Sequence, residues 1–196
     1  MKNWTKRQKE IIEFAIKIIV EEGIENFTTK NLASKLGISE AALYRHFNGK
    51  NDIVTSILEY FEDIARDTLR LAKRFDNAIE RLKFIFKTRA ENFAKSPGFV
   101  ILILSEEIFP PDPLLTEKIK GIMLMNKENI EKIIEEGQKK GEIRKDIDKE
   151  TLFYMVVGPF RFMITRWRLM NFGFDLLKTF NSLWTGIEKV LKQESL

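Results

Sequence analysis

The chain contains no cysteine and a single histidine among its 196 residues. It can therefore form no disulfide, thiolate nucleophile or Cys-based zinc site, and one histidine excludes a histidine-rich metal site within a protomer. We expect no metal and no cofactor. The longest apolar stretches, 99–104 and 152–160, are far shorter than the roughly 20 residues that span a bilayer. The N-terminus is polar, without the apolar region of a signal peptide, so the sequence predicts a cytoplasmic protein with no membrane segment.

Catalytic sequence patterns are also absent. The chain has no GxGxxG, P-loop or GxSxG motif and no His/Cys constellation. Glu106 and Glu107 are adjacent, so on a helix their side chains would diverge by about 100° and could not act as an acid–base pair. We therefore expect that the protein is not an enzyme.

The charge that is present is unevenly distributed. The whole chain has a formal net charge of only +4, but the first 50 residues hold nine Lys/Arg against six Asp/Glu. A mildly basic head on a nearly neutral body suits a protein whose head meets phosphates, although a generic solvated surface would also account for charge alone.

Residues 27–50, FTTKNLASKLGISEAALYRHFNGK, predict a helix-turn-helix. Thr28 is a candidate N-cap for a first helix, and Gly37 follows it where the chain needs a positive φ. Ser39 is the candidate N-cap of a second, nine-residue helix. Two helices joined by a short glycine turn allow the second to lie in a DNA major groove. The residues expected to pack inside are Leu32, Ala33, Leu36, Ile38, Leu43 and Phe47.

The second helix is expected to present an aromatic and basic face. With Leu43 pointing inward, Ala41 and Arg45 point away from the core, flanked by Ala42 and Tyr44. Arginine can bind guanine bidentately, alanine can contact thymine methyls, and aromatic or histidine side chains can reach phosphates or stack. An ordinary helical hairpin with a solvated face would leave this cluster unexplained. The predicted DNA-contacting residues are Thr28, Thr29, Lys30, Ser39, Ala41, Ala42, Tyr44, Arg45, His46 and Lys50.

Residues 5–54 resemble the DNA-binding domain of the TetR family of transcriptional regulators. The resemblance rests on EEG at 21–23, TTKNLA at 28–33, GISEAALYRHF at 37–47 and Lys50. Family members often carry Gly-Thr where this chain has Ala-Ala at 41–42, which moves the expected base readout towards the tyrosine and arginine that follow.

The resemblance implies a homodimeric repressor that a small hydrophobic ligand releases from double-stranded operator DNA. One alternative is a helical dimeric DNA-binding protein that acts constitutively or as an activator, without an effector. Another is an all-helical binding or scaffold module that no longer contacts DNA.

The sequence predicts an all-α fold of about nine helices in two domains. Residues 1–50 form the three-helix DNA-binding domain, and residues 51–196 form a helical-bundle domain for ligand binding and dimerisation. No Gly/Ser/Pro-rich linker separates them, so we expect movement of the body to reach the head. Beyond the helix-turn-helix, apolar periodicity and capping residues predict helices over 5–22, 51–74, 76–95, 97–108, 113–140, 149–170 and 176–192.

The last helix carries a 3-4-3-4 apolar pattern, typical of a coiled-coil-like seam. The resemblance implies that such a terminal helix pair forms a four-helix bundle between protomers. The alternative is that both helices are buried within one monomer. The predicted dimer-interface residues are Leu177, Phe180, Trp184, Ile187 and Leu191.

A ligand pocket is predicted around the dipeptide Gly158-Pro159, because a proline inside a helix removes a backbone hydrogen bond and can kink the helix beside a cavity. Aromatic residues at helical spacing could instead be ordinary core, and an arginine among them could pair with a carboxylate rather than with an acidic ligand. The predicted pocket residues are Phe99, Ile103, Phe109, Met123, Phe160, Arg161, Ile164 and Trp167.

Overall fold

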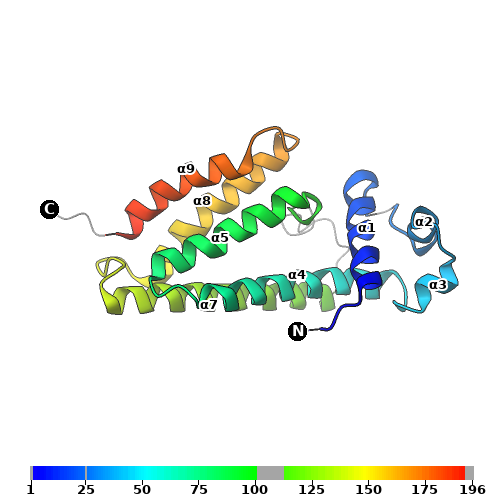
Figure 1. Ribbon diagram of the computed structural model, residues 1–196, viewed down its shortest axis with the longest axis horizontal. Coiled ribbons are helices and arrows are strands. Elements are labelled where there is room, and N and C mark those ends of the chain that lie inside the picture. Colours follow the sequence, from blue (N-terminus) through cyan, green and yellow to red (C-terminus); the bar gives the residue numbers. More distant parts are fainter. Residues whose placement is uncertain (1, 25, 101–112, 193–196) are drawn as a thin grey trace. The chain divides into compact units, whose positions relative to one another are not determined.

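The computed structural model describes residues 2–24, 26–100 and 113–192. All regular structure within these ranges is helical, which confirms the predicted all-α class (Figure 1). Of the predicted helix 97–108, residue 97 is in a turn, residues 98–100 are helical, and residues 101–108 lie outside the described residues. The helices are α1 (Lys6–Glu22), α2 (Thr29–Lys35), α3 (Glu40–Tyr44), α4 (Lys50–Ala72), α5 (Ala78–Lys95), α7 (Pro113–Lys140), α8 (Lys149–Leu169) and α9 (Leu176–Leu191).

The chain divides into two compact units. Unit 1 comprises Met1–Ile64 and Ile101–Ile119, and unit 2 comprises Ala65–Val100 and Lys120–Leu196. Helices α4 and α7 each begin in unit 1 and end in unit 2. By packing, the first half of α4 therefore belongs with the helix-turn-helix. The functional boundary expected at residue 50 stays a prediction.

Unit 1 is built around the apolar face of α1. The helix begins with a capping box, in which the Thr5 side chain accepts from the Gln8 backbone N–H and the Gln8 side chain accepts from the Thr5 backbone N–H. Side chains of α1 to α4 and of the loop before α2 then close a common core. Its fully buried members include Ile11, Ile12, Phe27, Leu32, Leu43, Ile53 and Ile57.

The helix-turn-helix forms as its capping residues predict. Thr28 accepts a hydrogen bond from the Asn31 backbone N–H, and Ser39 accepts one from the Ala42 backbone N–H. Gly37 has a φ of +66°, a conformation that L-residues with a Cβ rarely adopt. Helix α3 is shorter than the nine residues expected, and Arg45 is its C-cap with helical dihedral angles. The turn and both caps are thus confirmed, whereas the length of the second helix was overestimated.

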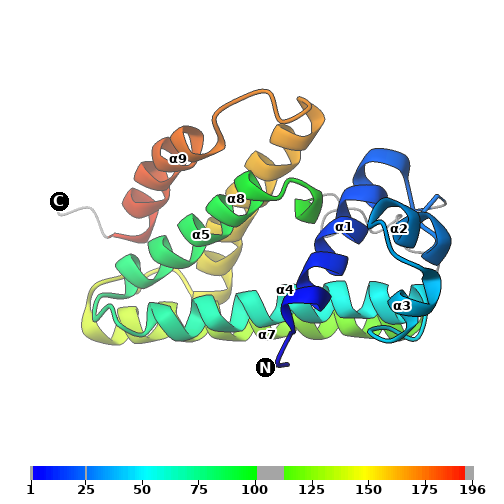
Figure 2. The same ribbon diagram turned by 45° about the vertical axis from the view of Figure 1, so that its right-hand side comes forward.

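Unit 2 has an aromatic core formed by α5, α8 and α9. Figures 1 and 2 show α8 and α9 as an antiparallel pair alongside α5. Asp148 and Asp175 are the N-caps of α8 and α9, and their side chains accept from the backbone N–H groups of Thr151 and Lys178. The centre of the core is a cluster of stacked and edge-on rings: Phe86, Phe160, Phe180 and Trp184.

The predicted dimer seam is wrong for four of its five residues. Phe180, Trp184, Ile187 and Leu191 are buried within the protomer, because they form the face of α9 that packs on α5 and α8. Only Leu177 is partly exposed. The alternative, burial within one monomer, holds for this face of α9. Any contact that α9 makes with a second subunit must therefore use a different face of the helix.

Helices α5 and α7 meet closely at one point within unit 2. A Cβ on Gly137 of α7 would lie 2.7 Å from the Ala78 Cβ of α5 and 2.7 Å from the Ile143 Cδ1. From this point the two helices diverge along their lengths (Figures 1 and 2).

Replacing Gly137 with alanine should destabilise the protein, because the new methyl group must push the α5 backbone away. Overpacking of this kind costs about 1–3 kcal/mol, and each kcal/mol lowers the melting temperature of a protein of this size by about 2–4 °C. Thermal denaturation followed by circular dichroism measures the shift. Gly121→Ala on the same helix is the control, since a Cβ there meets nothing within 4 Å and alanine favours the helix by up to about 1 kcal/mol. Equal melting temperatures for the two variants would contradict this packing.

Candidate nucleic-acid interface

The solvent-facing side of α2 and α3 carries most of the predicted contact residues. Tyr44 is 50% exposed, and Lys30, Ala41 and Arg45 are also exposed. Ala42 and His46 are half-buried. The short side chains leave the α3 backbone accessible, while the tyrosine and arginine project from its C-terminal end. This combination can place a hydrogen-bond donor fork and an aromatic ring against base edges or phosphates.

The hydroxyl residues of the predicted set build the site as well as facing solvent. Thr28 and Ser39 are exposed, and their side-chain oxygens accept the capping hydrogen bonds. Thr29 donates its hydroxyl proton to the Glu40 carboxylate at 3.1 Å, which links α2 to α3. The two caps therefore fix where α2 and α3 begin, and the Thr29–Glu40 hydrogen bond holds α3 to α2.

Lys50 is placed differently from the other basic residues. Its ammonium donates to the Ile24 carbonyl at 3.1 Å and lies 5.7 Å from the centre of the Phe27 ring. Lys50 thus joins the start of α4 to the loop between α1 and α2. The sequence predicted a lysine that flanks the DNA backbone, and the structure adds a fixed protein contact that positions the loop.

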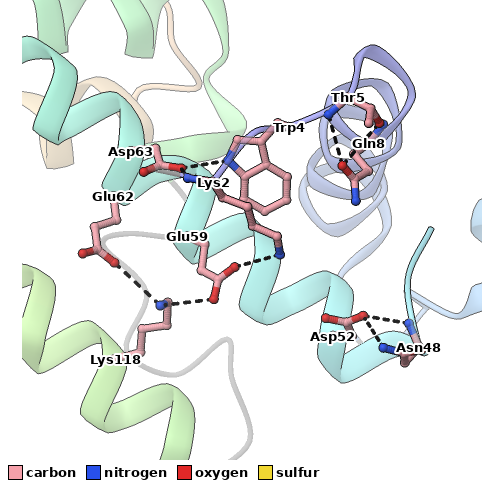
Figure 3. Close-up of polar contacts among 10 residues, drawn as sticks. All are labelled: Lys2, Trp4, Thr5, Gln8, Asn48, Asp52, Glu59, Glu62, Asp63 and Lys118. Carbon is pink, nitrogen blue, oxygen red and sulfur yellow. Dashed lines mark hydrogen bonds and ion pairs between the residues drawn. The ribbon is translucent and has the colours of Figure 1, made fainter.

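The N-terminal segment contains a contact that the sequence analysis missed (Figure 3). Trp4 is buried, its indole Nε1 donates to Asp63 of α4 at 2.9 Å, and its ring packs edge-on against Tyr60. The Lys2 backbone N–H also donates to Asp63, at 3.1 Å, and the Lys2 ammonium pairs with Glu59 at 3.1 Å. The start of α1 is therefore attached to α4. A tryptophan within a polar N-terminus was the available signal.

Burial has a measurable effect at this contact. It raises the pKa of the Tyr60 phenol above its ordinary value, and the negative charge of Glu13 raises it further. The raised pKa keeps the phenol uncharged beside the indole to a higher pH than in an exposed tyrosine.

The start of α7 is tied to α4 within unit 1. The Lys118 ammonium lies 3.5 Å from a Glu59 oxygen and 3.6 Å from a Glu62 oxygen (Figure 3). One lysine thus bridges two carboxylates that lie three residues apart on α4. Glu59 in turn binds Lys2, so a chain of ion pairs connects the N-terminal segment, α4 and α7.

The predicted pocket residues do not share one environment. Phe160, Ile164 and Trp167 are buried, and the Trp167 indole donates to the Phe174 carbonyl at 2.9 Å. Phe99 is buried at the end of the described segment, whereas Ile103 and Phe109 lie outside the described residues.

Two predicted pocket residues are exposed instead. Met123 is 53% exposed and Arg161 is also exposed, as are Gly158 and Pro159 on α8. The pocket assignment is therefore wrong for Met123 and Arg161, because their side chains point away from the core that holds Phe160.

Comparison with known sequences gives two family matches that together span most of the chain. A family model described as "Bacterial regulatory proteins, tetR family" matches residues 11–57. A second, described as "YsiA-like protein, C-terminal region", matches residues 58–189. Among curated proteins, the nucleoid occlusion factor SlmA of Glaesserella parasuis is 28% identical over 194 residues, covering 95% of this chain and 93% of that protein.

Solved structures share the fold over nearly the full chain. The fatty acid degradation regulator FadR of Bacillus halodurans matches with a TM-score of 0.82 at 19% identity, covering 95% of this chain and 97% of that one. FadR of Bacillus subtilis in complex with stearoyl-CoA matches with a TM-score of 0.79 at 22% identity, covering 95% and 100%. At these identities the likeness establishes the fold alone.

The two lysines of the candidate interface should behave differently when each is replaced by methionine. Both variants should reduce the salt dependence of DNA binding by about one unit of log–log slope, because each removes one cation from the phosphate-facing side. Only Lys50→Met should also lower the melting temperature, by the loss of a hydrogen bond worth about 0.5–1.5 kcal/mol. Fluorescence anisotropy over a salt series and thermal denaturation measure the two effects. Equal melting temperatures for Lys30→Met and Lys50→Met would contradict the structural role of Lys50.

Proposed function

Because the chain belongs to the tetR family of bacterial regulatory proteins, we propose that it is a homodimeric transcriptional repressor that a small hydrophobic ligand releases from its operator. The observation that carries the proposal is the exposed C-terminal end of α3. There Tyr44 and Arg45 project beside two alanines from a helix held by its Ser39 cap and the Thr29–Glu40 hydrogen bond. Such a surface suits direct readout of a major groove.

Dimerisation is proposed to use the outer face of α8 and one flank of α9. Phe162 and Leu169 of α8 are 71% and 69% exposed in the protomer. Large apolar side chains that are exposed together on one helix often mark an interaction surface. On α9, Leu183 and Val190 lie on a flank that the protomer does not fully bury. Pairing these faces across a twofold axis would remove them from water, as an isologous interface requires.

Two glycines support the same surface. Gly158 of α8 and Gly186 of α9 are exposed within helices, where glycine is about 1 kcal/mol less favourable than alanine. A Cβ at either position would meet nothing within 4 Å in the protomer, so intramolecular packing does not require them. Close packing against a second helix would require glycine at these positions, because a larger side chain would hold the two helix backbones apart.

The effector part of the proposal rests on the family and on unit 2. The structurally similar FadR of Bacillus subtilis was solved in complex with stearoyl-CoA, and the core of unit 2 is rich in aromatic rings. A ligand that prefers one conformational state by about 1–3 kcal/mol changes operator affinity about 5- to 150-fold. A hydrophobic effector of modest selectivity would therefore suffice for induction.

A second candidate follows from the full-length relatives. The SlmA proteins, which are nucleoid occlusion factors, match this chain over nearly its whole length. A factor that acts on the nucleoid rather than on one gene would bind DNA away from promoters. Mapping of binding sites on the chromosome separates the two functions, since a repressor should occupy sites that overlap promoters.

Selection of bound duplexes from a random pool should yield a pseudo-palindrome whose half-sites lie about one helical turn (~34 Å) apart. Arg45→Ala should weaken binding to this operator by about 1–3 kcal/mol and relax the preference at one base pair per half-site. Anisotropy titrations with operator variants measure both effects. Operator binding like that of the wild type by an Arg45→Ala, Tyr44→Ala double variant would refute the readout assignment.

Phe162→Glu should convert the dimer to a monomer, because the dimer would bury an unpaired carboxylate, which is strongly unfavourable. The fold should survive, since the side chain is exposed in the protomer. Light scattering reports the mass and circular dichroism the fold. The control is Asn181→Glu, an exposed position on the opposite flank of α9, which should remain dimeric. A dimeric Phe162→Glu protein would show that another surface joins the subunits.

A further inference from the structure

Helix α5 carries two arginines that face α7, and they differ in their partners. Arg81 donates through Nη1 to the Glu136 carboxylate of α7, so its charge is compensated. Arg89 lies two turns further along α5 and donates through Nη2 to the neutral amide oxygen of Asn126 at 2.5 Å. Its guanidinium also lies 5.3 Å from the centre of the Phe86 ring. Arg89 therefore brings a positive charge to this part of unit 2 and meets no carboxylate among the described residues.

The surroundings of Arg89 make this uncompensated charge costly. Its side chain keeps some contact with solvent, but burial of the guanidinium lowers its pKa to about 10. The group is still protonated at neutral pH. A desolvated charge without a counter-ion is unfavourable, and perturbed ionisable groups of this kind occur preferentially at functional sites.

Asn126 is held in an orientation that leaves most of the guanidinium donors available. Its own amide N–H donates to the Ile122 carbonyl at 2.8 Å, which turns its oxygen towards Arg89. A guanidinium has five N–H donors in a planar fork, and this hydrogen bond uses one of them. The remaining donors can bind a carboxylate, whose two oxygens match the fork.

A second donor without an acceptor lies against the same aromatic ring. The Trp184 side chain is 1% exposed, and its indole Nε1 has no hydrogen-bond partner among the described residues. The Trp184 ring stacks on Phe86 at 6.0 Å between centres. Buried indole N–H groups are normally hydrogen-bonded. The Phe86 ring thus contacts both the Arg89 guanidinium and the indole ring of Trp184, whose N–H has no acceptor among the described residues.

The helices that carry Arg89 and Asn126 are diverging where these residues lie. Helices α5 and α7 approach each other closely at Ala78 and Gly137, and both residues of the pair lie about three turns away from that contact. There the long arginine side chain bridges the two helices. Figures 1 and 2 show the same divergence.

From these contacts we infer that Arg89 is the anchor for the carboxylate of an acid with an apolar chain, with the Trp184 indole as a further donor to the ligand and the rings of Phe86 and Phe160 beside the chain. The inference rests on the proposed function for its meaning, because it names the chemical class of the effector. The ligand supplies the anion that the described part of the chain does not bring to Arg89, and binding moves no proton and forms no covalent bond.

Calorimetric titration with decanoate, laurate and palmitate, and with the alcohols of the same chain lengths, tests the site directly. The wild-type protein should bind at least one acid about tenfold or more tightly than its alcohol. Arg89→Met should weaken that acid about tenfold or more and leave the alcohol unchanged, while Arg89→Lys should recover part of the loss. Trp184→Phe, which keeps a ring but removes the N–H, should weaken the acid severalfold. Arg81→Met is the matched control and should bind both like the wild type.

Thermal denaturation without ligand distinguishes a binding role from a structural one. Arg81→Met leaves the Glu136 carboxylate without its partner and should lower the melting temperature by a few degrees. Arg89→Met removes a charge that has no counter-ion among the described residues and should cause a smaller drop or none. Acid binding by Arg89→Met at wild-type affinity would overturn the inference, as would the absence of measurable binding of every acid to the wild type.

Gel shifts with the selected operator separate the inference from the proposed function. Release of the operator by the acid from the wild type, but not from Arg89→Met, supports both. Binding of the acid through Arg89 without release keeps the anion site and refutes acid-induced derepression. Equal release from the wild type and Arg89→Met keeps the repressor function and refutes the anion site.

Discussion

Packing of the first half of α4 against α1 and the helix-turn-helix is the interaction on which the DNA-binding end of the chain depends. The chain has no disulfide to hold a small three-helix unit together, and so few residues bury little surface by themselves. Helix α4 supplies fully buried Ile53 and Ile57 to that core. It also supplies Asp63 to the Trp4 indole and Lys50 to the Ile24 carbonyl. These contacts fix both ends of α1, and α1 carries the apolar face on which α2 and α3 rest.

Local signals predicted the helix-turn-helix well because its geometry is decided within a few residues. Thr28, Ser39 and Gly37 act through hydrogen bonds and dihedral angles that involve only their near neighbours in sequence. Contacts between distant residues were not predictable in this way. The Lys50 contact joins residues 26 positions apart, and the Trp4–Asp63 contact joins residues 59 apart. A pattern can show that such side chains are unusual without showing which partner they meet.

The error on α9 has a different cause. Its apolar pattern correctly identified a strongly amphipathic helix, but periodicity shows which face is apolar and not which molecule covers it. The larger side chains, Phe180 and Trp184, fill the core of the protomer. The face left exposed has smaller residues such as Val190 and Gly186. An interface between closely packed helices favours small residues, so the less hydrophobic stripe is the better candidate for the subunit contact.

The apolar pattern of the sequence also contained a signal for Arg89. The sequence pattern predicted an arginine among aromatic residues on α8, but Arg161 is exposed there. On α5 the buried residues Leu82, Phe86 and Phe93 recur at helical spacing, and Arg89 occupies a position of that same stripe. A charge within an apolar stripe breaks the binary pattern, and such a break is where a functional group is to be expected.

Helix α7 carries both the hydrogen-bond partner of Arg89 and a lysine that pairs with α4. Asn126, which accepts from Arg89, and Lys118, which pairs with Glu59 and Glu62 of α4, lie on one continuous helix about 12 Å apart. An anion bound at the remaining donors of Arg89 would lie beside its hydrogen bond to Asn126 and so act on a contact of α7 in unit 2. The ion pairs of Lys118 hold the same helix to α4 in unit 1, and partly exposed pairs of this kind are worth about 0–1 kcal/mol each. The coupling that regulation requires is about 1–3 kcal/mol. Contacts of this size on α7 are therefore of the order that such coupling requires.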